Sequence, residues 1–74
     1  MIIKIEDTYI NLDKVQYILP FKDAKGSWII KVQFAPSGYI HIGAYSNKDI
    51  ADKVIHSAKV VSFPKELGSA VLPQ

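Results

Sequence analysis

The sequence predicts an α+β domain, an antiparallel sheet of four or five strands with one C-terminal helix packed on one face. Eleven of the 74 residues are Ile, and β-branched residues favour strands. Large apolar residues recur at every second position of 28–34, as in a strand with one buried face. One amphipathic segment with a capping signal follows at 47–60. A chain of this length has room for only one such domain.

Five short apolar segments, separated by polar or glycine-bearing turns, have the composition of strands. They span residues 3–5, 9–12, 15–19, 28–34 and 39–43. Alternation along the third segment places Val15, Tyr17 and Leu19 on one face. A proline and a glycine in 35–38 are typical of a tight turn, so the last two segments are expected to form a hairpin.

The helix is expected to begin after Ser46, whose side chain can cap the first turn together with Asp49. Pro64 prevents it from continuing past Phe63. Its apolar stripe contributes to a core shared with the strands. The expected core residues are Ile5, Ile10, Val15, Tyr17, Trp28, Ile30, Val32, Phe34, Ile40, Ile42, Ile50, Val54, Ile55 and Ala58.

These boundaries divide the chain into a sheet-plus-helix domain, 1–62, and an apolar C-terminal tail, 63–74. Two interpretations of the tail stay open. It is either a frayed terminus or an apolar strap that docks on a neighbouring subunit or on an uncovered sheet edge. The apolar anchors of such a strap are Phe63, Leu67, Val71 and Leu72.

The segments 3–5, 9–15, 32–34 and 37–43, followed by a capped helix, resemble a group of short bacterial and phage proteins of unknown function. These proteins have a trimmed pleckstrin-homology-like sheet and a C-terminal helix. The resemblance covers residues 1–60 and implies that fold, but it implies no catalytic or binding residue. The helix departs from the family's acidic pattern because lysines alternate with aspartates in it. A partner that recognises an acidic helix is therefore not implied.

Composition argues against catalysis and against a metal centre. The chain has no Cys, and His41 and His56 stand apart without a metal-binding motif. No serine lies in a nucleophile elbow, and no glycine-rich loop precedes the helix to hold a phosphate. We therefore expect a non-enzymatic protein with no catalytic residue, no metal and no cofactor.

Charge and hydropathy indicate the expected compartment. Nine Lys, no Arg and seven acidic residues give a net charge of +2, which is a weak electrostatic signal for a nucleic-acid partner. No apolar run approaches the roughly 20 residues that span a bilayer, and the first residues lack a secretory signal. With no cysteines either, the expected location is the cytoplasm, with no membrane partner.

Two functional interpretations remain, and both use the sheet face opposite the core. That face is expected to carry Ile29, Lys31, Gln33, Tyr39 and His41. Its apolar area favours a small interaction module, a homodimer or other small homo-oligomer, that binds another protein or a small ligand at a subunit groove, as bacterial or phage accessory and inhibitor factors do. The alternative is a single-stranded nucleic-acid-binding protein that uses the aromatic and lysine side chains of the same face.

Overall fold

Six strands and one α-helix form in residues 1–62, the part of the chain that this computed structural model describes. The α+β class and the antiparallel pairing are confirmed. The expected tail anchors Phe63, Leu67, Val71 and Leu72 lie outside the described residues. The elements are β1 (Ile2–Ile5), β2 (Thr8–Asn11), the 3-10 turn η1 (Leu12–Lys14), β3 (Val15–Lys22), β4 (Trp28–Phe34), β5 (Tyr39–Tyr45), α1 (Lys48–His56) and β6 (Lys59–Val61).

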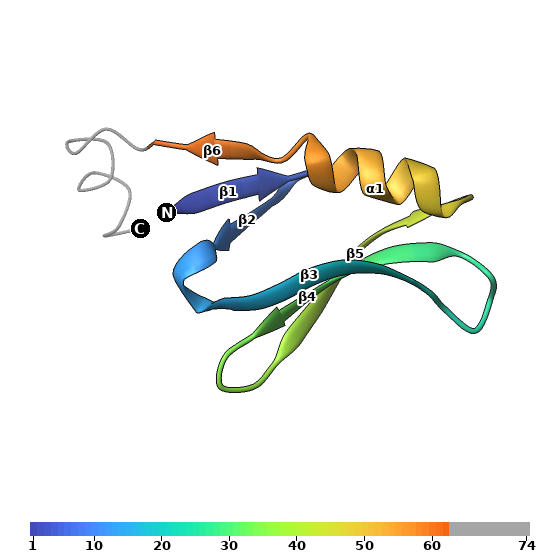
Figure 1. Cartoon of the computed structure of the whole chain (residues 1–74), viewed down its shortest axis with the longest axis horizontal. Helices are drawn as coiled ribbons and strands as arrows, with labels where there is room; N and C mark the ends of the chain where they lie inside the picture. Colours follow the sequence, from blue (N-terminus) through green and yellow to red (C-terminus); the bar gives the residue numbers. More distant parts are fainter. Residues whose placement is uncertain (63–74) are drawn as a thin grey trace.

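The strands form two three-stranded sheets, which corrects the expectation of a single sheet of four or five. One sheet has the order β2-β1-β6 and the other the order β3-β4-β5. The η1 turn separates them, because the Asn11 side chain accepts a hydrogen bond from the backbone N–H of Asp13 at 3.0 Å and bends the chain there. Strand β2, before the turn, therefore belongs to one sheet, and β3, after the turn, belongs to the other (Figure 1).

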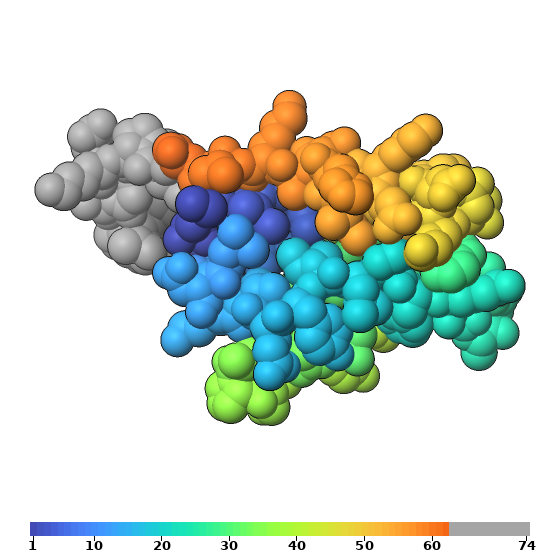
Figure 2. All heavy atoms as spheres, viewed as in Figure 1, coloured from blue at the N-terminus to red at the C-terminus, as the bar shows by residue number. Residues whose placement is uncertain are grey.

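Strand β6 differs from the sequence expectation, in which the amphipathic segment 47–60 extends the helix over Lys59 and Val60. The helix instead ends at His56, and β6 pairs antiparallel with β1, with Ile2 opposite Val61. Two consecutive valines favour this extended conformation. In the space-filling view β6 lies against β1, and the loop between β4 and β5 protrudes at the opposite edge (Figure 2).

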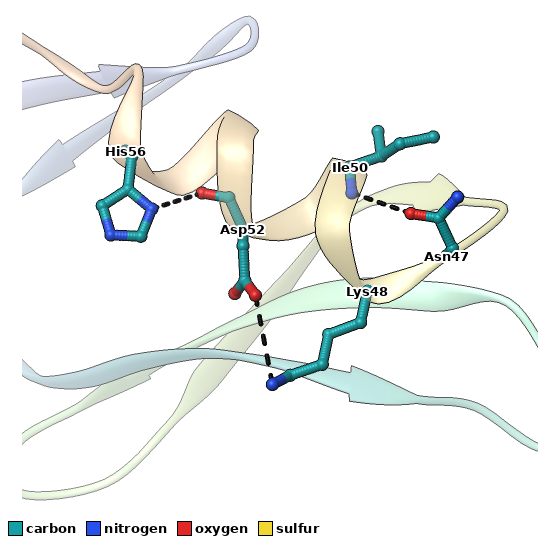
Figure 3. Close-up of polar contacts among 5 residues, drawn as sticks. All are labelled: Asn47, Lys48, Ile50, Asp52 and His56. Atoms are coloured by element: carbon teal, nitrogen blue, oxygen red, sulfur yellow. Dashed lines mark hydrogen bonds and ion pairs between the residues drawn. The ribbon is translucent and has the colours of Figure 1, made fainter.

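The helix is capped one residue later than expected. The Oδ1 atom of Asn47, and not the Ser46 side chain, accepts a hydrogen bond from the backbone N–H of Ile50 at 2.9 Å (Figure 3). Both residue types cap helices well, so composition alone did not distinguish them. Lys48 and Asp52 form an exposed ion pair at 4.0 Å on the same helix.

The core lies between the two sheets and α1. Figure 1 shows β1, β2, β6 and α1 on one side of this core and β3, β4 and β5 on the other. The helix contributes mainly Ala51, which is fully buried, whereas the predicted core residue Ile50 is 39% exposed. The central buried side chains are Ile3, Ile5, Ile10, Ile30, Val32, Ile42 and Ala51.

Tyr17 is also wrongly predicted as a core residue. The register of β3 on β4 shifts between Val15 and Tyr17, so an extra residue interrupts the alternation at this point. Beyond it, Ile18 lies opposite Val32 and packs against the core. Strict alternation from Val15 would place Tyr17 and Leu19 on the core face. Because of the shift, both lie on the opposite face of the sheet.

The end of β5 holds a tyrosine against a glycine. Gly43 has a φ of 72°, and a Cβ atom there would lie 2.5 Å from ring atoms of Tyr45. The Tyr45 hydroxyl is buried, and no described residue forms a hydrogen bond with it. Burial raises the pKa of Tyr45, and the charge of Glu6 raises it further. Glu6 itself has a φ of 54°, in the left-handed region, at the turn between β1 and β2.

Candidate binding face on the second sheet

The side of sheet β3-β4-β5 that faces away from the core gathers aromatic rings around one lysine. Residues opposite one another on neighbouring strands share a face, and two rows cross the sheet here. One row joins Tyr17, Gln33 and Tyr39, and the next joins Leu19, Lys31 and His41. We call this surface the aromatic–lysine face; its members are Tyr17, Leu19, Phe21, Ile29, Lys31, Gln33, Tyr39 and His41.

Lys31 lies at the centre of the face, on the middle strand. Its Nζ atom is 4.9 Å from the ring centroid of Tyr39 on one side and 6.0 Å from that of Tyr17 on the other. Such cation–π contacts contribute about 0.5–1 kcal/mol at exposed sites. The two tyrosines are 58% and 40% exposed, so they position the ammonium group while keeping much of their own surface accessible to a ligand.

The rings continue along the face from strand to strand. His41 stands 5.0 Å from Tyr39, tilted by 35°, and meets Phe21 edge-on at 5.1 Å. Phe21 and His41 come from the two outer strands, so their contact passes across β4. A connected series of side chains therefore runs over the sheet from β3 to β5.

Two predicted members of the face do not serve as contact groups. Ile29 is only 8% exposed and lies in the row of Phe21, so it does not leave the expected apolar patch open. The Gln33 amide donates a hydrogen bond to the carbonyl oxygen of Gly38 at 2.9 Å. Gln33 therefore holds the turn between β4 and β5 against this face. The backbone N–H of Phe34 donates a second hydrogen bond to the same Gly38 carbonyl at 2.8 Å.

The face has a one-sided charge pattern. Strands β3, β4 and β5 contain no Asp or Glu, whereas they contain Lys22 and Lys31. The ion pairs of the described chain lie elsewhere, at Met1 with Asp13 and on α1. An anion that approaches the rings consequently meets a cation and no carboxylate from these strands.

Sequence reasoning brought together Lys31, Gln33, Tyr39 and His41 but missed the contribution of β3. Tyr17 and Phe21 complete the ring series, and the irregularity after Val15 is what turns them outward. Nothing in the local sequence marks that irregularity.

Comparison with known proteins found no relative of this chain. No protein-family model, no curated protein sequence and no solved structure matches this chain. The pleckstrin-homology-like resemblance therefore stays a prediction. Within residues 1–62, no three His, Cys, Asp or Glu side chains gather in a way that could hold a metal ion. None of the helices in that range is long and apolar enough to cross a membrane.

Proposed function

We propose that the protein is a small, non-enzymatic binding module that holds single-stranded nucleic acid on the aromatic–lysine face. The position of Lys31 between Tyr17 and Tyr39, on strands without a carboxylate, is the observation that supports this most. Exposed rings stack on unpaired bases whatever their sequence, and a lysine beside them neutralises the phosphate backbone. With no Arg in the chain and the Gln33 amide hydrogen-bonded to the Gly38 carbonyl, the face offers few groups that distinguish one base from another, so binding is expected to depend little on sequence.

Self-association through this face is the competing interpretation, and Ile29 adds little to it because that side chain is covered within its own chain. A symmetric contact centred on this face would also bring two copies of Lys31 together with no carboxylate from β3, β4 or β5 between them. Like charges brought together in an interface oppose association. Homo-oligomerisation, and binding of another protein or a small ligand at a subunit groove, remain predictions of the sequence.

The test is binding of fluorescein-labelled oligothymidine, followed by fluorescence anisotropy at low and physiological salt. Loss of one stacked base is worth about 1–3 kcal/mol, so Tyr39→Ala is expected to weaken binding roughly 5- to 150-fold. Lys31→Gln is expected to reduce the slope of log affinity against log salt by about 0.7. Tyr9→Ala and Lys25→Gln, at exposed residues outside the face, are the matched controls.

Two results would refute this function. One is no anisotropy change with single-stranded DNA at low salt, and the other is equal weakening by Tyr39→Ala and Tyr9→Ala. Sedimentation of the free protein tests the competing interpretation. A dimer that Tyr39→Ala dissociates would assign the face to self-association instead.

A further inference from the structure

A groove lies on the other layer of the molecule, between α1 and the strands β1 and β6. It has a volume of about 390 Å³. Ile50, Lys53 and Val54 line one wall, at the i, i+3, i+4 spacing of a single helical stripe. Lys4, Glu6 and Lys59 line the other wall. Because α1 packs on the core side of β3-β4-β5, this lysine groove is separate from the aromatic–lysine face.

The groove holds more positive charge than the chain neutralises. Lys4 and Lys59 stand directly opposite one another in the antiparallel pairing of β1 with β6. Like charges in this arrangement destabilise a sheet. Neither they nor Lys53 form an ion pair with any described residue, and Glu6 is the one carboxylate among the lining side chains. A ligand carboxylate would relieve this repulsion, which gives the groove a preference for acidic partners.

The wall formed by the helix is apolar between the charges. Ile50 is partly exposed, and its side chain points away from β3, β4 and β5 (Figure 3). Val54, one turn further along, is half-buried beside it. Ala51 is fully buried in the core and Val54 packs partly against that core, so the exposed part of Ile50 and the remaining surface of Val54 form the apolar area available to a ligand. A bare inorganic anion would leave this surface unused.

We propose that the lysine groove docks an acidic segment of a partner protein that inserts one or two large apolar side chains. The carboxylates of that segment pair with Lys4, Lys53 and Lys59, and its apolar side chain packs on Ile50 and Val54. The volume is at the lower end of the 300–1,000 Å³ typical of ligand sites, which suits a short peptide segment. The inference is independent of nucleic-acid binding on the aromatic–lysine face.

The test uses a fluorescein-labelled peptide in which Asp-Glu pairs flank Leu-Phe, with binding followed by anisotropy. Lys59→Glu is expected to weaken binding by at least about tenfold, because it repels the peptide and forms an opposite-charge pair with Lys4. That same pairing is expected to raise the melting temperature, so loss of binding cannot be attributed to unfolding. Lys25→Glu, an equal charge change in the loop between β3 and β4, is expected to leave binding unchanged.

A second peptide, with Ser-Ser in place of Leu-Phe, tests the apolar wall without altering the protein. It is expected to bind about tenfold more weakly, since two large side chains are no longer buried. Equal binding of both peptides, or complete displacement by inorganic phosphate, would show a simple anion site and overturn the proposal. Equal weakening by Lys59→Glu and Lys25→Glu would show non-specific attraction and overturn it as well.

Discussion

Replacing Tyr45 by Phe is expected to stabilise the protein. The hydroxyl of Tyr45 is buried and forms no hydrogen bond with a described residue. A buried polar group without a partner costs about 1–3 kcal/mol, and the ring is only half-buried, so we expect a gain at the low end, about 1 kcal/mol. For a domain of this size, that corresponds to a rise of about 4–8 °C in melting temperature.

Urea unfolding followed by fluorescence of Trp28, the one tryptophan, measures this change. The midpoint should rise while the slope stays constant, because the surface exposed on unfolding hardly differs. Tyr39→Phe is the control, since its hydroxyl lies on a strongly exposed side chain and water replaces any bond it makes. A Tyr45→Phe protein less stable than the parent at pH 7 would show that the hydroxyl has a partner.

The same substitution has a pH dependence with a definite sign. The pKa of Tyr45 is raised in the folded protein by burial and by Glu6, whereas an unfolded tyrosine ionises near its usual value of about 10. As pH rises through 10, the unfolded chain loses this proton before the folded one does, and stability falls. Tyr45→Phe lacks this loss, so its advantage should widen above pH 10. A constant difference between pH 7 and pH 11 would contradict the raised pKa.

Three further substitutions test the backbone. Gly43→Ala should destabilise the protein more than Gly38→Ala. Both glycines have a positive φ, but only at Gly43 would the new Cβ meet the Tyr45 ring, and the urea midpoints of the two variants measure the difference. Asn47→Ala should lower the free energy of unfolding by about 1 kcal/mol and Ser46→Ala by much less, and equal losses would contradict the assigned cap. Glu6→Gly should raise the melting temperature, because glycine adopts a φ of 54° without strain; a lower one would show that the carboxylate stabilises the turn.

The extent to which the sequence predicted this fold varied from strand to strand. Alternation predicted the core side of β4 correctly for Ile30 and Val32, because nothing interrupts the strand between them. It failed for Tyr17, since a one-residue irregularity reverses every side chain after it and has no local signal. Strand β6 is three residues long and directly follows the helix, so its pattern is too short to separate from the helical one.

The two candidate sites also differed in how far the sequence predicted them, because one depends on local pairing and the other does not. The hairpin of β4 and β5 is local, and its turn residues are visible in the sequence, so Lys31, Tyr39 and His41 could be placed together. The lysine groove depends on Lys4 facing Lys59, a contact between opposite ends of the described chain. Long-range pairings of this kind are set by tertiary packing and leave no periodic trace.

The pairing of β1 with β6 also determines the order in which the two sheets can form while the chain is being synthesised. Sheet β3-β4-β5 consists of successive hairpins and can form as soon as β5 has been made. Strand β1 is made first. It has β2 on one side and must wait for β6, the last strand of the described residues, on the other. Until then, its free backbone N–H and C=O groups form an open sheet edge, which is a template for pairing with other chains. Nascent or truncated chains that end before Lys59 are therefore expected to aggregate more readily than chains that include β6, a short edge strand that carries a lysine.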